Sequence, residues 1–125
     1  TFERCNVNNW TALIEIHANI NGTRSTYPVM KNILIENNTF IDFPSKLLDI
    51  TSADRVTVRN NTVKNPTALA NDNGNRGEIS CHNASNITIS GNTYLASPYM
   101  SRSVISFEDS AFRVTGLTVK NNTYR

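Results

Sequence analysis

One short motif recurs four times along the chain: a strand-like apolar stretch that ends in Asn-Asn-Thr or Gly-Asn-Thr, followed by an aromatic or aliphatic residue. The copies span residues 32–40, 55–63, 86–94 and 116–124. The second residue of each turn triplet, hereafter the ladder asparagine, is Asn38, Asn61, Asn92 or Asn122, which gives a repeat of 23, 31 and 30 residues. A period in this range is typical of solenoids, in which successive repeats stack along one axis.

Apolar residues lie two positions apart within every copy, as in Ile33 and Ile35 or Val56 and Val58. Period two predicts a strand with one buried face, and helical spacing is not sustained anywhere in the sequence. The asparagine turn bends the chain sharply after this strand, because asparagine adopts the left-handed backbone conformation at low cost. A second family of strands precedes the first, at residues 13–17, 47–51, 78–82 and 104–108.

Three short strands per repeat predict an all-β fold, a right-handed parallel β-helix solenoid of about four coils. The step from the second strand family to the next strand is six residues in both middle coils, from Ile50 to Val56 and from Cys81 to Ile87. Equivalent residues would then stack at about 4.8 Å per coil, and the ladder asparagines would bond to one another. The expected inward columns are Ile16, Ile50, Cys81 and Phe107; Ile35, Val58, Ile89 and Val119; and Phe40, Val63, Tyr94 and Tyr124.

The composition limits the classes of partner. The 125 residues predict one domain, 1–125, and the net charge of +2 comes from scattered basic residues, so nucleic acid is not an expected partner. No apolar run approaches the ~18 residues of a membrane span, so we expect no membrane insertion. Cys5 and Cys81 would lie at least two coils apart, roughly 10 Å, beyond the ~7 Å between Cα atoms that a disulfide tolerates. We therefore expect two free buried thiols.

Both ends of the sequence read as incomplete coils. Thr1-Phe2 matches the Thr39-Phe40 end of a repeat whose strand is missing, and residues 122–125 stop within a coil. The end coils of a solenoid expose open strand edges and core side chains. We therefore expect the chain to be a piece of a longer protein, truncated at both ends, and to associate with itself end to end when isolated.

The repeats resemble the pectate-lyase-like superfamily of right-handed β-helices over nearly the whole chain. A closer likeness covers residues 2–63, where the segments 2–5, 32–40 and 47–62 look like the later coils of glycoside hydrolase family 110. That family consists of inverting exo-α-galactosidases, several of them from gut bacteria. The resemblance implies a bacterial, secreted, carbohydrate-active protein, extracellular or periplasmic. The family's catalytic acids lie in coils before the matched region, so no family catalytic residue is transferred to this chain.

Ligands of such folds usually bind along the outer face of the strand family that precedes the asparagine turn. Two outward columns are predicted on that face, Glu15, Asp49, Ser80 and Ser106, and beside them His17, Thr51, His82 and Glu108. Glu15 and Asp49 would lie about 5 Å apart, closer to the spacing of a retaining pair of carboxylates than to that of an inverting pair. Repulsion between them would favour protonation of one, which would supply a general acid. The alternative is two solvated carboxylates on an exposed strand.

The candidate catalytic residues are thus Glu15, Asp49, His82 and Glu108, the last two as an adjacent pair that is more usually a plain surface contact. The candidate glycan contacts are Trp10, His17, Tyr99 and Arg102, although Trp10 and Tyr99 would serve equally well as covers of the core edge. His17 and His82 would be two coils apart, near 10 Å, which is too far to share a metal ion. No metal or other cofactor is expected.

Three functions remain open on the sequence alone. The first is a segment of a glycoside hydrolase, α-galactosidase-like, that contributes to a glycan cleft, with the isolated chain inactive. The second is a non-catalytic β-helix stalk or glycan-binding module of a surface protein. The third is a polysaccharide lyase or epimerase, which the absence of lysine and arginine from the outer columns disfavours. The expected partner is a carbohydrate, either an oligosaccharide or a polysaccharide.

Overall fold

The computed structural model describes residues 1–3, 12–16, 18–20, 23–24, 29–43, 46–66, 79–95, 105–107 and 114–125. These residues form strands and the turns between them, and none of them is helical. One short hairpin is antiparallel, β3 (Asn19–Ile20) with β4 (Thr23–Arg24), and every other strand pairs in parallel. The all-β class and the parallel pairing expected from the alternating pattern are therefore confirmed.

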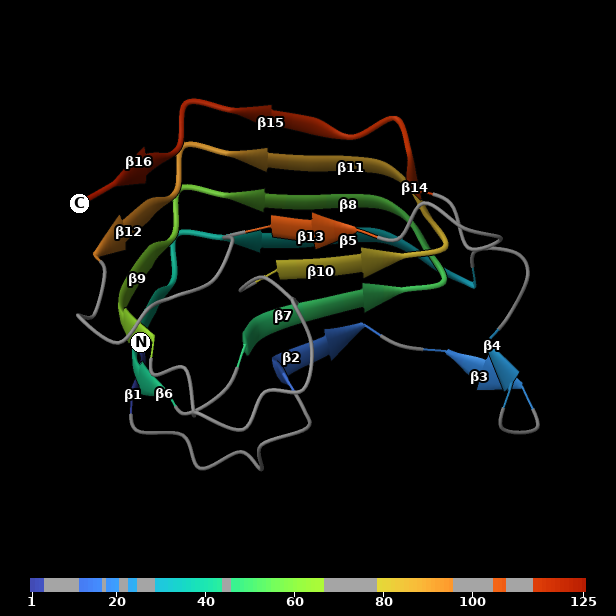
Figure 1. The fold of residues 1–125 in the computed structure, drawn as a ribbon, viewed down its shortest axis with the longest axis horizontal. Helices are drawn as coiled ribbons and strands as arrows, with labels where there is room; N and C mark the ends of the chain where they lie inside the picture. Colours follow the sequence, from blue (N-terminus) through green and yellow to red (C-terminus); the bar gives the residue numbers. More distant parts are fainter. Residues whose placement is uncertain are drawn as a thin grey trace.

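Three parallel sheets make up the fold, and we number them in the order in which the chain visits them (Figure 1). The first sheet contains β2 (Ala12–Ile16), β7 (Lys46–Thr51), β10 (Ile79–His82) and β13 (Ile105–Phe107). The second contains β5 (Met30–Glu36), β8 (Ala53–Arg59), β11 (Ala84–Ser90), β14 (Val114–Thr115) and β15 (Thr118–Lys120). The third contains β1 (Phe2–Glu3), β6 (Thr39–Phe43), β9 (Thr62–Pro66), β12 (Thr93–Leu95) and β16 (Thr123–Tyr124).

Each repeat of the sequence adds strands to all three sheets, and we call such a set a rung. The first rung is β2, β5 and β6, the second β7, β8 and β9, and the third β10, β11 and β12. The fourth is β13, β14, β15 and β16, while β1 extends the third sheet beyond β6. Because sequence neighbours are not sheet neighbours, paired residues lie beside their equivalents in the next repeat, which brings together residues that are 23 to 38 positions apart.

Residues with a positive φ form the turns between the sheets. Single residues join the first sheet to the second, Ser52 (φ 58°) between β7 and β8 and Asn83 (φ 47°) between β10 and β11. This one-residue turn explains the constant six-residue step in the sequence. Between the second and third sheets, the left-handed residue is the one before the ladder asparagine: Asn37, Asn60, Gly91 and Asn121, with φ between 55° and 64°. Asparagine and glycine are the residues that tolerate this conformation best.

The ladder of asparagines is present, as predicted. The backbone N–H of Asn61 and its side-chain Nδ2 both donate to Oδ1 of Asn92, at 2.9 and 3.0 Å. Asn92 makes the same two bonds to Oδ1 of Asn122, both at 3.0 Å. At the other end, the N–H of Asn38 donates to Oδ1 of Asn61 at 3.0 Å. Each amide also reaches a backbone carbonyl, Ile35 for Asn61, Val58 for Asn92 and Ile89 for Asn122.

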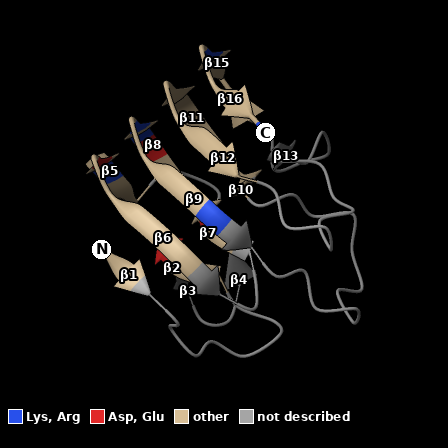
Figure 2. Ribbon diagram, turned by 90° about the vertical axis from the view of Figure 1, so that its left-hand side faces the viewer, with Lys and Arg blue, Asp and Glu red and all other residues tan. Residues whose placement is uncertain are grey.

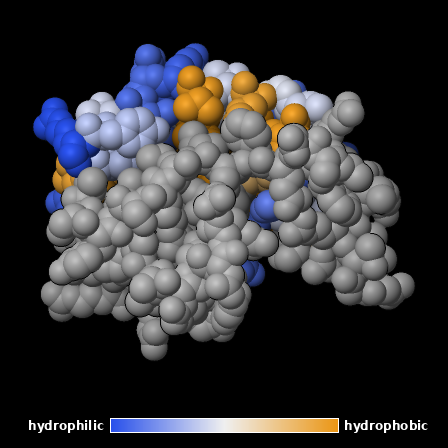
Figure 3. Space-filling model, viewed as in Figure 1, coloured by the Kyte–Doolittle hydropathy of each residue, from blue (hydrophilic) through white to orange (hydrophobic). Residues whose placement is uncertain are grey.

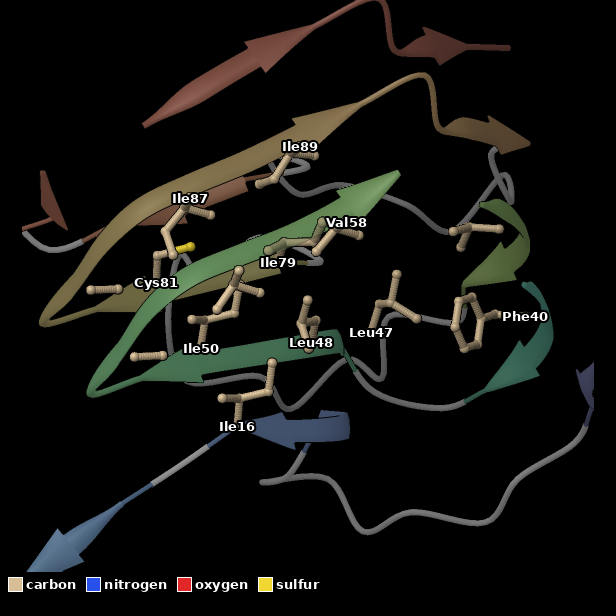
Figure 4. Packing of buried hydrophobic residues seen from close by; sticks show 14 of the residues in the cluster. Ile16, Phe40, Leu47, Leu48, Ile50, Val58, Ile79, Cys81, Ile87 and Ile89 are labelled. Carbon is tan, nitrogen blue, oxygen red and sulfur yellow. The ribbon is translucent and has the colours of Figure 1, made fainter. Parts of the chain in front are cut away.

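The apolar core lies between the sheets, and the labelled side chains of Figure 4 point into it from strands of all three. The register confirms the first predicted column, since Ile16 pairs with Ile50, Ile50 with Cys81, and Cys81 with Phe107. Ile16, Ile50 and Cys81 are buried, and nothing is described of the Phe107 side chain. Cys81 is a free thiol, as predicted, whereas Cys5 lies outside the described residues.

Two of the residues predicted to be inward are exposed instead. Val119 pairs with Ile89 and Tyr124 with Tyr94, as the repeat alignment predicted. However, Val119 is 46% exposed and Tyr124 is 50% exposed, so their expected burial is wrong. The physical reason is that, among the described strands, β15 and β16 are the last of their sheets, so no described strand covers the ends of these columns.

Candidate functional site

The first sheet carries the predicted polar column. Glu15 of β2 pairs in register with Asp49 of β7, Asp49 with Ser80 of β10, and Ser80 with Ser106 of β13. Glu15 keeps its register with Asp49 and is exposed. We call Glu15 and Asp49 the carboxylate pair.

The surroundings of the two carboxylates differ. Asp49 is half-buried and accepts a hydrogen bond from the Thr51 hydroxyl, with 2.8 Å between Oγ1 and Oδ1. Among the described residues, Glu15 accepts one long hydrogen bond, with 3.4 Å between the backbone nitrogen of Ala12 and Oε1. Asp49 therefore has a fixed orientation, whereas Glu15 is held mainly by its strand.

The thiol of Cys81, one strand away from Asp49, is in its least reactive form. Burial, together with the negative charge of Asp49, raises the pKa of Cys81 to about 12. Since the thiolate is the nucleophile, Cys81 does not serve as one at neutral pH. Its role is packing within the apolar core.

His82 lies beside Thr51, as the second polar column predicted. Its expected place at the surface is wrong, because His82 is 3% exposed and Thr51 is 1% exposed. Alternation along the strand places these side chains on the same side as Asp49, but burial closes this part of the face to solvent. His82 can therefore contact a ligand only if this cover opens.

The remaining predicted residues lie outside the described residues. These are the catalytic candidate Glu108 and the glycan-contact candidates Trp10, His17, Tyr99 and Arg102. Within the described part of the chain, no group of three or more histidine, cysteine or acidic side chains could hold a metal ion. The same part contains no helix long and apolar enough to cross a membrane.

A second polar cluster, which the sequence reasoning missed, lies at the corner where β8 and β11 begin. Asp54 is 7% exposed, and its Oδ1 accepts hydrogen bonds from Ser85 Oγ and Asn86 Nδ2, both at 2.8 Å. Its Oδ2 is 2.7 Å from the Arg55 guanidinium. The hydrogen bonds from Asn86 and Ser85, with the charges of Arg55 and Lys31, lower the pKa of Asp54 below its usual value.

This Asp54 cluster joins two rungs, since Asp54 and Ser85 are register partners. The repeat alignment alone could have found it, because Ser85 is 31 residues after Asp54, the same step that separates Asn61 from Asn92. Its carboxylate is fully occupied by protein partners. We therefore assign it to holding the corner together rather than to ligand binding.

Most of the charged residues whose side chains are described lie in strands of the second sheet, and Figure 2 marks them by colour on β5 and β8. Arg59 donates to Glu36 at 2.6 Å, and Arg55 donates to the side-chain oxygen of Asn32 at 2.7 Å. Both bonds again join neighbouring rungs. Between these charged residues runs a column of Leu34, Thr57, Thr88 and Thr118.

No family model, curated protein or solved structure matches this chain. The assignment of function therefore depends on the residues themselves.

Proposed function

We propose that the chain is a segment of a right-handed parallel β-helix in a secreted bacterial glycoside hydrolase of the α-galactosidase type. In this proposal the outer face of the first sheet forms part of the glycan cleft. The observation that carries it is the carboxylate pair in register, continued along the same column by Ser80 and Ser106. The parallel register of the three sheets and the asparagine ladder support the β-helix. An extracellular or periplasmic location follows from the proposed class of enzyme.

The carboxylate pair is suited to binding sugar hydroxyls rather than to breaking the glycosidic bond. Register partners in neighbouring strands are about 4.8 Å apart, whereas an inverting pair needs roughly 6.5–9.5 Å to admit water. The family that the sequence resembles is inverting, so Glu15 and Asp49 do not fit its mechanism.

Binding and turnover are tested on residues 1–125 with the variants Asp49→Asn and Glu15→Gln. We expect no hydrolysis of a panel of aryl α- and β-glycosides. We expect retardation in affinity gels that contain an α-galactoside polymer, and loss of that retardation in both variants. Glu36→Gln, which makes the same chemical change on another sheet, is the matched control and should keep it. Turnover that disappears in Asp49→Asn would instead make the pair catalytic, and retardation equal in all variants would refute the site.

The second candidate is a non-catalytic β-helix stalk or glycan-binding module. The burial of His82 favours it, because among the described side chains of the first sheet the acid–base groups that reach solvent are then the exposed Glu15 and the half-buried Asp49. Hydrolysis by a longer protein that contains this chain, lost on Asp49→Asn or Glu15→Gln, would exclude a purely structural role. A lyase or epimerase is the third candidate, and cleavage of a uronic-acid polymer with release of an unsaturated product would identify it.

A further inference from the structure

Thr51 ties the carboxylate pair to the buried part of the first sheet. It follows Asp49 on β7 at the next position of the same strand face, and β7 lies between β2 and β10 (Figure 1). Thr51 Oγ1 donates to Asp49 Oδ1 at 2.8 Å. Thr51 is 1% exposed, and its register partner His82 is 3% exposed. Because burial keeps water from competing for the Thr51 hydroxyl, this charge-assisted bond holds the Asp49 carboxylate in one orientation.

The two carboxylates should therefore respond differently to a ligand. Glu15 has a longer side chain with an additional rotatable bond, and among the described residues it accepts one long hydrogen bond, at 3.4 Å from the Ala12 nitrogen. It can turn to follow a donor in several positions. Asp49 instead accepts well only from a donor that lies where its carboxylate already points. An acceptor oriented in advance also loses less conformational freedom on binding.

Directional contacts are what this sheet offers to a sugar. Figure 3 shows hydrophobic residues at the surface along the edge where β15 lies in Figure 1, and β15 belongs to the second sheet. Among the described side chains of the first sheet, the polar ones that reach solvent are Glu15 and Asp49. Apolar burial is not directional, so discrimination between sugars that differ only in the direction of a hydroxyl depends on how these carboxylates are oriented.

We propose that Thr51 is a positioning residue that determines sugar specificity, because by fixing Asp49 it lets the first sheet distinguish an axial from an equatorial hydroxyl. Galactose and glucose differ only in the direction of the hydroxyl on C4, which a fixed acceptor distinguishes and a mobile one does not. Specificity is here a difference between two affinities, set by a residue that itself does not touch the sugar. The inference rests on the proposed function, since it requires a glycan at the carboxylate pair.

Two substitutions separate the hydrogen bond from the packing. Thr51→Val removes the hydroxyl at nearly constant shape, and Thr51→Ser keeps it. Residues 1–125 are retarded in a gel that contains an α-galactoside polymer and are released with methyl α-galactoside or methyl α-glucoside, which yields an apparent Kd for each. We expect the wild-type chain to favour the galactoside about tenfold, Thr51→Val to reduce this ratio to about twofold, and Thr51→Ser to restore it. Thr57→Val, the same change at a half-buried position of the second sheet, is the matched control and should keep the wild-type ratio.

The orientation of Asp49 is measured separately, without a sugar. Three-bond NMR couplings about its Cα–Cβ bond should report a single rotamer in the wild-type chain and in Thr51→Ser, and averaging over rotamers in Thr51→Val. Urea unfolding checks that each variant is folded, and Thr51→Ala replaces Thr51→Val if the valine chain is not.

The outcomes separate this inference from the proposed function. A wild-type chain that is not retarded at all would refute the glycan site, and the role of Thr51 with it. Retardation that is lost in Asp49→Asn, together with an unchanged galactoside preference in Thr51→Val, would overturn the role of Thr51 alone. Rotamer averaging of Asp49 in the wild-type chain would overturn that role whether or not the variants fold.

Discussion

Replacing Asn92 by leucine tests the ladder where it is most buried. Asn92 is 1% exposed, and its side chain takes part in four hydrogen bonds. Nδ2 donates to the Val58 carbonyl and to Asn122 Oδ1, while Oδ1 accepts from the N–H and Nδ2 of Asn61. Leucine has nearly the same shape but offers no donor or acceptor, so the change isolates the hydrogen bonds from the packing.

The magnitude follows from the groups left without partners. The Val58 carbonyl and the Asn61 N–H are both buried, and each buried unsatisfied group costs about 1–3 kcal/mol. The extra apolar surface of leucine offsets part of this loss, by roughly 1–2 kcal/mol. We expect the free energy of unfolding of Asn92→Leu to fall by about 3 kcal/mol, a large share of the roughly 5–15 kcal/mol typical of a domain.

Asn38→Leu is the matched control within the same ladder. Within the described part of the chain, the Asn38 side chain makes one hydrogen bond, from Nδ2 to the Glu36 carbonyl at 3.0 Å, and it is only half-buried. Its loss should lower the free energy of unfolding by about 1 kcal/mol. Urea denaturation followed by circular dichroism compares the two variants. An unchanged slope of the unfolding free energy against urea concentration shows that only stability has changed. Equal losses for both asparagines would show that the ladder bonds do not decide stability here.

Three further predictions follow from other parts of the molecule. The pKa of Asp54 is lowered, first by the hydrogen bond from Asn86, so the ionised carboxylate stabilises the fold above the usual carboxyl pKa near 3.8, and this stabilisation is lost as the pH falls below that value. In Asp54→Asn, the urea concentration at half unfolding should therefore fall less steeply as the pH is lowered. In a variant whose other cysteine is serine, Cys81 should resist a thiol reagent at pH 8 until urea unfolds the chain, because its pKa is raised to about 12. Reaction at urea concentrations at which the chain stays folded would contradict the burial of this thiol. Gly91→Ala should lower stability by about 1–2 kcal/mol, since the new Cβ would lie 2.5 Å from Asn60 Oδ1 at a φ of +64°; combining it with Asn60→Gly should restore part of that loss in a double-mutant cycle.

The alternating pattern and the repeat length were enough to predict the register of the sheets. A strand turns every second side chain inward, and the repeat length fixes which residue comes next in a column. The pairing of Glu15 with Asp49 therefore followed from the same counting as the pairing of Asn61 with Asn92. The bounds of the strands were less predictable, since β2 includes Ala12 and β7 includes Lys46, each one residue before the expected start.

Burial could not be predicted in the same way, because it depends on what lies over a side chain rather than on the strand that carries it. Val119 occupies an inward position but is exposed, because no strand of the described residues lies beyond β15. His82 occupies an outward position and is nevertheless covered.

The same distinction applies to the candidate site. The register decides that Asp49 has Glu15 on one side and Ser80 on the other, and these partners define what the face can bind. Access is decided by tertiary cover, which closes the face at Thr51 and His82 and leaves it open at Glu15. A glycan that binds this face should therefore approach from the first rung, which is why Glu15→Gln is as informative a test as Asp49→Asn.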